Sequence, residues 1–273
     1  MSVTAVRYFV GDQTVPALPD LDRGLAYGDG LFETVRAHQG RMHWWPAHWQ
    51  RLQRGAAMLR ITLPDERIVL AEATRLLDGG NVVLKLVVTR GSGGRGYSPV
   101  QACVPNWTLS THPLPPSPAA GLSLRWCDTR LALQPALAGI KHCNRLEQVL
   151  ARGEWDDPAI DEGLVCSSEG DVVSATAANV FILRQGAWST PQVDRCGVAG
   201  VCRAWALKAL PAREARLAVT DVEAADAVFL CNGVRGILPV ARLGARTWQP
   251  HLQVVALQHR LAAEHPAFAT EVS

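Results

Sequence analysis

The sequence predicts a protein of two mixed α/β domains, and three observations carry this prediction. At 273 residues the chain is long enough for one large domain or two modest ones. Strand-like and helix-like segments alternate along both halves. Between the halves stands HPLPPSPAAG (112–121), whose prolines suit neither a helix nor a central strand. We therefore expect a smaller N-terminal domain over 1–115 and a larger C-terminal domain over 116–273.

The first half begins with strands and continues with two helices. AVRYFV (5–10) is predicted as a strand, and GDQ forms a turn before a second, short extended segment. PAHWQRLQRGAAML (46–59) has apolar residues at helical spacing and proline in its first turn, and a second helix is expected over 65–77. The remaining predicted strands cover 31–37, 81–91 and 104–111.

The second half has the same mixed character. Its predicted strands cover 122–127, 162–166, 172–174, 180–184 and 227–231. Its predicted helices cover 144–154, a segment starting near Gly200, and 252–263. Asn144 is expected to cap the first of these helices.

Composition excludes several classes of protein. The net charge of +2 predicts no general attraction to nucleic acid or anionic lipid. The N-terminus lacks a basic segment followed by an apolar run, and no stretch approaches the roughly 20 apolar residues that cross a bilayer. The seven cysteines are scattered without a CxxC pair, which indicates reduced thiols in the cytoplasm. The eight histidines show no ligand spacing, so we expect no metal site.

One lysine stands in a segment that could take part in a chemical reaction. Lys141 lies in AGIKHCNRLEQVL (138–150), just before a predicted helix, where a cation opposes the helix dipole. His142 and Arg145 crowd it with positive charge, which would lower the pKa of an amine towards nucleophilic use. A lysine near a helix start is more often simply solvated. The segment alone leaves both interpretations open.

Further segments could bind an anion. Glycines precede the helix predicted in CGVAGVCRAW (196–205), and Asn232-Gly233 ends a strand in FLCNGVRGILPV (229–240). Arg51 could pair with a phosphate, and TRGSGGRGYS (89–98) could touch a carboxylate through Arg95 and Tyr97. Each has an ordinary alternative: a turn, a hairpin, or a solvated arginine.

In order and spacing, these segments resemble the fold-type-IV pyridoxal-phosphate enzymes. That family includes branched-chain and D-amino-acid aminotransferases and aminodeoxychorismate lyases. The resemblance runs from YGDGLFETVR (27–36) to CNGVRGILPV (231–240). RGSGGRGYS and AGIKHCNRLEQVL are most similar to the lyases, which form 4-aminobenzoate and pyruvate for folate synthesis.

The resemblance implies a role for each motif residue. Lys141 would carry pyridoxal 5'-phosphate as a Schiff base and act as the general base. A phosphate site and a substrate site would surround Lys141. Glu33 and Tyr27 are weaker candidates for the substrate site. The phosphate site would comprise Arg51, the amides of Val201 and Cys202, Asn232 and Gly233; the substrate site would comprise Arg95, Tyr97, Glu33 and Tyr27. The resemblance also implies a homodimer whose sites lie between domains and borrow from the neighbouring subunit.

One position departs from the family pattern G-x-V-T-E-x-x-x-x-N. In GDVVSATAAN (170–179), Ser174 occupies the place of the glutamate that keeps the cofactor's ring nitrogen protonated. A hydroxyl can only hydrogen-bond that nitrogen, which weakens the electron sink. Because aromatisation drives lyase chemistry, the change favours a lyase over the alternative aminotransferase. A cofactor-binding homologue without activity is the third reading.

Overall fold

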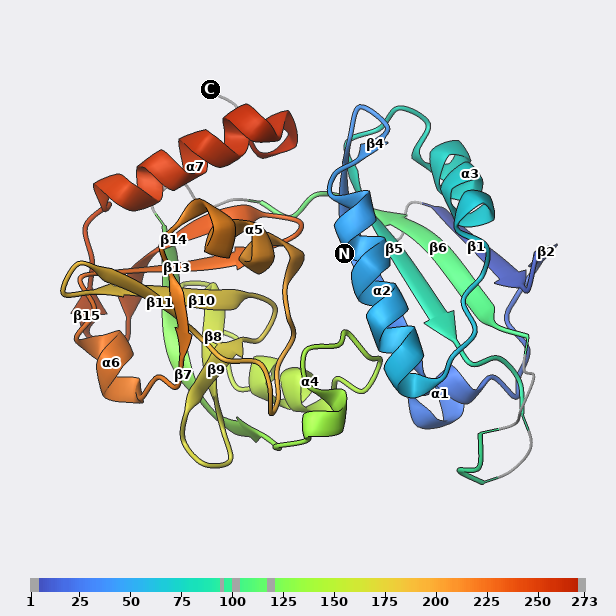
Figure 1. The fold of residues 1–273 in the computed structure, drawn as a ribbon, viewed down its shortest axis with the longest axis horizontal. Coiled ribbons are helices and arrows are strands. Elements are labelled where there is room, and N and C mark those ends of the chain that lie inside the picture. Colours follow the sequence, from blue (N-terminus) through green and yellow to red (C-terminus); the bar gives the residue numbers. More distant parts are fainter. Residues whose placement is uncertain (1–4, 94–95, 100–103, 117–120, 270–273) are drawn as a thin grey trace. The chain divides into compact units, whose positions relative to one another are not determined.

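The computed structural model describes residues 5–93, 96–99, 104–116 and 121–269, and the chain divides into two compact units (Figure 1). The first unit comprises Met1–Pro115 with Ile140–Asn144, and the second comprises Pro116–Gly139 with Arg145–Ser273. The division at 115 lies in the proline-rich segment. The segment that carries Lys141 belongs to the first unit, which differs from the predicted division.

The first unit is built on an antiparallel sheet in the order β2-β1-β6-β5-β3-β4. Apolar side chains of β3 and β5 alternate with the pleat, so that Val35, Leu84 and Leu86 are buried in the core. The strands are β1 (Ala5–Val10), β2 (Gln13–Val15), β3 (Gly30–His38), β4 (Arg41–Met42), β5 (Val82–Thr89) and β6 (Asn106–His112).

Three helices accompany this sheet: α1 (Arg23–Tyr27), α2 (Trp45–Leu59) and α3 (Glu66–Leu77). Helix α2 packs on β3, and α3 packs on β5 and β6. Asp65 caps α3 by accepting from the Arg67 amide at 2.8 Å. The predictions of helices at 46–59 and 65–77 are confirmed.

The second unit contains a mixed sheet in the order β12-β11-β10-β13-β14-β7-β8-β9, with β15 paired to β14. The pairs β7–β8, β7–β14 and β11–β12 are parallel, and the others are antiparallel. Strand β9 also contacts β10, so the sheet curls back on itself. Its strands are β7 (Leu122–Leu131), β8 (Glu162–Ser167), β9 (Val172–Ala175), β10 (Asn179–Arg184), β11 (Ala187–Pro191), β12 (Arg213–Ala215), β13 (Ala227–Asn232), β14 (Gly236–Leu243) and β15 (Arg246–Thr247).

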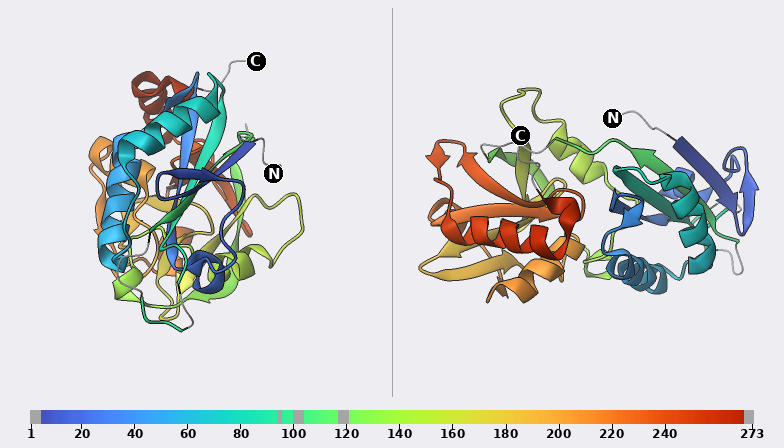
Figure 2. Two further views of the ribbon diagram at one scale, coloured as in Figure 1. Left: turned by 90° about the vertical axis from the view of Figure 1, so that its right-hand side faces the viewer. Right: turned by 90° about the horizontal axis from the view of Figure 1, so that it is seen from above.

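Helices cover parts of this second sheet. The C-terminal α7 runs along β14 (Figure 2), while α5 packs on β13 and α4 packs on β7 and β8. The helices are α4 (Leu146–Arg152), α5 (Val201–Ala209), α6 (Val219–Glu223) and α7 (Leu252–Glu264). In the part of the chain that the structure describes, no helix combines the length and apolar character needed to span a membrane.

The prediction that Asn144 caps a helix is wrong. Helix α4 begins at Leu146 after Arg145, and no side chain caps it. The Asn144 amide nitrogen donates instead to the Gly28 carbonyl at 3.0 Å. This bond ties the segment 140–144 to the first unit, so the side chain is not available to the helix.

Candidate active site

Lys141 lies in a segment that continues the sheet of the first unit. The Phe32 amide donates to the Lys141 carbonyl at 3.0 Å, and the Cys143 amide donates to Gly30 at 2.9 Å. Leu31 and His142 form the bridge between these two bonds. Strand β3 meets β4 only at its other end, which leaves its first residues open for this pairing. The backbone of Lys141 is therefore fixed by β3.

The side chain of Lys141 lies against an aromatic ring. Its Nζ is 4.1 Å from the centre of the Phe32 ring, within the range of a cation–π contact. The following residue on β3 is Glu33, whose side chain points to the opposite face, as strand alternation requires. Two adjacent residues of β3 therefore serve different neighbours: Phe32 contacts the Lys141 amine, and Glu33 supplies a buried carboxylate.

Glu33 forms a buried cluster with two residues of α2. Arg51 Nε donates to Glu33 Oε1 at 2.8 Å, and Arg51 Nη2 donates to Oε2. His48 Nδ1 is 2.7 Å from the same Oε2, which assigns it as the donor tautomer. His48 and Arg51 share one face of the helix because they are three residues apart. The expectation of a substrate contact for Glu33 differs from this arrangement, since both its oxygens bind protein groups.

The electrostatics of this cluster favour a charged Glu33. Burial raises the pKa of its carboxyl, but the charge and hydrogen bonds of Arg51 and the contact with His48 outweigh burial and lower it to about 2. Burial lowers the pKa of His48, which favours the neutral imidazole. Arg51 is thus held as a fixed, charged fork. A phosphate contact of Arg51 stays a prediction.

Two predicted substrate residues meet in the first unit. The rings of Tyr27 and Tyr97 lie edge to face with centres 5.5 Å apart, and the Tyr27 hydroxyl accepts from the Gly96 amide at 3.2 Å. Tyr97 is 86% exposed, as a ligand-contacting side chain would be. Arg95 lies outside the described residues.

In the second unit, Asn179 brings three segments together. Its Nδ2 donates to the Val198 carbonyl at 2.9 Å, and it pairs with Cys231 between β10 and β13. A Cβ added at Gly200 would lie 2.1 Å from Asn179 Oδ1, so only glycine allows this close approach. Asn232 then joins the cluster by donating to the Ala177 carbonyl at 3.3 Å. The motifs around 175–179, 198–202 and 231–233 therefore meet at one end of this sheet.

This end of the sheet has the donors that an anion needs. Helix α5 begins at Val201 after Gly200, and no side chain caps it. The first amides of a helix point outward and favour negative charge, so Val201 and Cys202 fit the predicted phosphate contact. The side-chain oxygen Oδ1 of Asn232 is used within the hairpin, where it accepts from the backbone amides of Val234 and Arg235 at 3.0 and 2.8 Å. A phosphate contact of Asn232 and Gly233 stays a prediction.

Ser174 lies on β9, next to this cluster in sequence. It is partly buried and pairs with Val165 of β8. Glu169, five residues earlier, lies in a turn and pairs with Arg195 at 2.5 Å. It is therefore committed to a surface ion pair rather than replacing the missing glutamate.

Sequence reasoning missed two residues of these clusters. His48 could have been found because H-x-x-R on a predicted helix places both side chains on one face. Asn179 ended the motif that contains Ser174, but its role depends on pairing with residues 19 to 52 positions away, which the motif does not encode.

A family profile gives the decisive comparison. The profile of amino-transferase class IV matches residues 30–243, which include Lys141, Ser174 and both segments predicted to bind phosphate. The chain belongs to this family. The prediction of a fold-type-IV enzyme is confirmed, and so is the mixed α/β fold class.

Relatives within the family include lyases and aminotransferases. The chain is 37% identical over 234 residues to the aminodeoxychorismate lyase of Vibrio harveyi, covering 82% of this chain and 86% of that one. A crystal structure of 4-amino-4-deoxychorismate lyase from Pseudomonas aeruginosa shares 39% identity with a TM-score of 0.89, covering 94% and 99%. A putative branched-chain-amino-acid aminotransferase of Methanocaldococcus jannaschii is 31% identical over 240 residues, covering 82% of each chain.

Proposed function

We propose that this class IV family member is a pyridoxal-phosphate-dependent lyase that converts 4-amino-4-deoxychorismate into 4-aminobenzoate and pyruvate. One observation carries the proposal: the two lyases named above share 37% and 39% identity with the chain over most of its length. The product 4-aminobenzoate would place the enzyme in folate synthesis. The scattered cysteines suit a cytoplasmic location.

The residues of the chain fit the cofactor. Lys141 is the candidate for covalent attachment, and the uncapped start of α5 supplies donors for the phosphate through Val201 and Cys202. Asn232 and Gly233 contribute from the adjacent hairpin, and Arg51 adds a fixed positive charge. We assign Glu33 and His48 to holding Arg51 in place. Ser174 is the candidate partner of the ring nitrogen.

The chemistry assigns two proton transfers to Lys141. When bound, pyridoxal phosphate supplies an electron-withdrawing ring that stabilises negative charge next to the substrate amine. Lys141 takes the proton from the carbon of the substrate ring that bears this amine. The carbon–oxygen bond to the enolpyruvyl group breaks, and the substrate ring becomes aromatic. Lys141 then returns a proton to the departing enolpyruvate, which yields pyruvate. Arg95, Tyr97 and Tyr27 are the candidates that bind substrate.

A direct assay tests the proposal. Purified protein loaded with cofactor is incubated with aminodeoxychorismate, and 4-aminobenzoate and pyruvate are measured separately. We expect equal amounts of both products. Borohydride should bleach the cofactor absorbance irreversibly and label Lys141; the only other lysines, Lys85 and Lys208, make the peptide assignment simple. Lys141→Ala should lose both label and turnover, while Lys208→Ala keeps them.

The second candidate is an aminotransferase of the same fold. The 31% identity to the putative branched-chain enzyme favours it. Incubation with an amino acid and a keto acid, without aminodeoxychorismate, distinguishes the two activities. A protein that forms the borohydride label but turns over neither substrate would be a cofactor-binding homologue without activity.

A homodimer is part of the proposal. Leu146, Val149 and Leu150 of α4 are 77%, 63% and 64% exposed and lie on one helix face. Contiguous apolar side chains in water are typical of a surface that another chain covers. Sedimentation should show a dimer, and Val149→Asp should shift it towards monomer.

A further inference from the structure

The side chain of Arg23 is buried in the first unit although it carries a permanent charge. Arg23 is the first residue of α1, and 4% of its side chain is exposed. Burying a guanidinium is costly unless its charge is paired and its donors are used. Its partners therefore account for its position.

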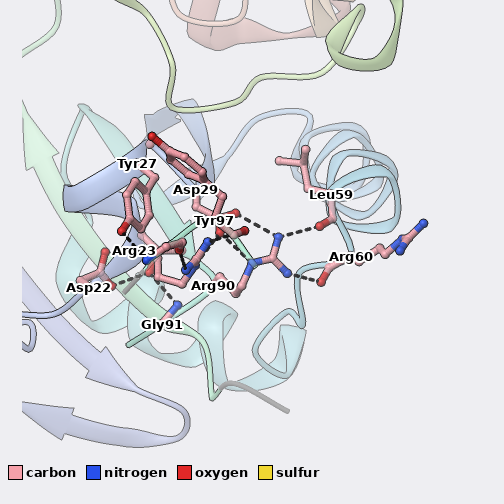
Figure 3. Close-up of polar contacts among 12 residues, drawn as sticks. Asp22, Arg23, Tyr27, Asp29, Leu59, Arg60, Arg90, Gly91 and Tyr97 are labelled. Atoms are coloured by element: carbon pink, nitrogen blue, oxygen red, sulfur yellow. Dashed lines mark hydrogen bonds and ion pairs between the residues drawn. The ribbon is translucent and has the colours of Figure 1, made fainter. Parts of the chain in front are cut away.

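The partners of Arg23 are one carboxylate and two backbone carbonyls (Figure 3). Its Nε donates to Asp29 Oδ2 at 2.9 Å, Nη1 donates to the Gly96 carbonyl at 3.0 Å, and Nη2 donates to the Tyr97 carbonyl at 3.3 Å. A planar fork can hold two consecutive carbonyls in this way, whereas an ammonium has no such geometry. A residue of α1 thus fixes the backbone at 96–97.

Tyr27, four residues along α1, also contacts this segment. Its hydroxyl accepts from the Gly96 amide at 3.2 Å, and its ring meets the Tyr97 ring edge to face. The guanidinium carbon of Arg23 lies 4.9 Å from the centre of the Tyr27 ring, a cation–π contact. Both Gly96 polar groups and the Tyr97 carbonyl therefore have partners on α1.

The carboxylate that anchors Arg23 is itself held in place. Asp29 accepts from Arg90 Nε and Nη2 at 2.7 and 3.0 Å, and Arg90 donates in turn to the carbonyls of Leu59 and Arg60 at the end of α2 (Figure 3). Burial raises the pKa of Asp29, but the two arginines outweigh it and the net pKa is lowered, so the carboxylate stays charged. A chain of hydrogen bonds and ion pairs thus links the segment 96–97 to α2.

The segment 96–97 that these contacts hold carries an exposed aromatic ring. Tyr97 is 86% exposed, whereas the guanidinium that fixes its backbone is almost completely buried. We propose that Arg23 is a positioning residue, which holds the Gly96 and Tyr97 carbonyls so that the Tyr97 side chain is preset to contact the carboxylate-bearing ring of the substrate. A preset contact avoids the entropy that a mobile loop loses on binding. The inference rests on the proposed lyase function, which supplies the substrate class.

Limited proteolysis tests the positioning without any turnover. Arg23→Lys keeps the positive charge but loses the fork that holds both carbonyls. Chymotrypsin cleaves after exposed aromatic residues, and we expect cleavage at Tyr97–Ser98 to be about five times faster in Arg23→Lys than in the wild type. Arg67→Lys, on the exposed face of α3, is the matched control and should cleave at the wild-type rate. An unchanged rate in Arg23→Lys would overturn the proposal.

Steady-state kinetics test the link to substrate. We expect Arg23→Lys to raise KM for aminodeoxychorismate roughly tenfold, with kcat within about twofold, because a binding contact is lost rather than a catalytic group. In a Tyr97→Ala background the same substitution should add nothing further. An equal rise in both backgrounds would show that Arg23 acts independently of Tyr97 and would sink the proposal.

Failure of the proposed lyase function and failure of the positioning role of Arg23 give different results. If the wild type does not turn over aminodeoxychorismate, the proposed function fails, while proteolysis still decides whether Arg23 fixes the segment. If Arg23→Lys lacks a cooperative thermal transition, Tyr27→Phe replaces it, since this variant removes only the hydroxyl that accepts from Gly96. It should then raise the cleavage rate by a smaller factor, and an unchanged cleavage rate would overturn the proposal.

Discussion

Lys141 and Phe32 contact each other twice: their backbones share a hydrogen bond of 3.0 Å, and the amine lies 4.1 Å from the ring centre. The backbone bond fixes where the lysine leaves the chain, and the ring restricts the side chain. Such restriction would help the two proton transfers proposed for Lys141, because the position of its amine is fixed before the substrate binds. Phe32 is therefore a supporting residue of the candidate site.

Replacing Phe32 by leucine should slow the enzyme without releasing its cofactor. The backbone hydrogen bond remains, while the cation–π contact, typically about 0.5–1 kcal/mol at a partly exposed site, is lost. We expect kcat for aminodeoxychorismate to fall by about two- to fivefold, with the cofactor absorbance unchanged. Phe32→Tyr retains a ring and should keep the wild-type rate. Equal losses in both variants would contradict a role for the aromatic face.

The buried cluster of Glu33 should make stability depend on acid pH. The pKa of Glu33 is about 2, below its ordinary value of 4.5, so the charged form is favoured in the folded state. Its contribution to the free energy of unfolding is present above pH 4.5 and is lost as the pH falls from 4.5 towards 2. The shift corresponds to about 3 kcal/mol. Urea unfolding at a series of pH values measures this loss.

The variant Glu33→Gln isolates that contribution. It leaves Arg51 charged and buried, and we expect the free energy of unfolding at pH 7 to fall by about 3–5 kcal/mol. Stability should then depend less on pH between 4.5 and 2 than in the wild type. Glu169→Gln, which removes a surface pair with Arg195, is the control and should cost at most about 1 kcal/mol. Similar pH curves for Glu33→Gln and the wild type would count against the assignment.

Much of the fold followed from local patterns. Apolar spacing over 46–59 is a signal within one segment, and the helices expected at 46–59 and 65–77 both form. The strands β11 and β12 were not predicted, because AWSTP ends in proline and REA has no β-branched or aromatic residue. They form by pairing with each other and with β10. Asn144 failed as a cap because its partner, Gly28, lies 116 positions away.

In the candidate site, too, some residues could be predicted from the sequence and others could not. Lys141, Arg51 and the glycine segments stand in motifs that can be read directly from the sequence. The partners that orient them cannot, since the Arg23 fork spans more than 70 positions to Gly96 and Glu33 reaches across to α2. Contacts between distant segments depend on the folded sheet, so the motifs indicated chemistry while the supporting residues needed the structure.

Gly200→Ala should weaken cofactor binding. The new Cβ would lie 2.1 Å from Asn179 Oδ1, so that the start of α5 or the Asn179 side chain must move. Because these amides are the predicted phosphate donors, we expect the Kd for pyridoxal phosphate to rise more than tenfold. Ala204→Gly, at an exposed position of the same helix, costs about 1 kcal/mol of helix stability and should leave this Kd unchanged. Titration of the apo form by absorbance measures both.

Ser174→Glu should change the balance between the two candidate reactions. A carboxylate at this position of β9 would keep the cofactor's ring nitrogen protonated and strengthen the electron sink, which amino transfer needs more than an elimination that ends in an aromatic ring. We expect transaminase activity with an amino acid and a keto acid to increase at least tenfold over the wild type, and lyase kcat to change by less. Ser174→Ala is the matched control, because it removes the hydroxyl without adding charge and should show no such increase. If Ser174→Glu binds the cofactor but gains no transaminase activity, the serine does not determine the choice of reaction, and that choice must lie with the substrate-binding residues.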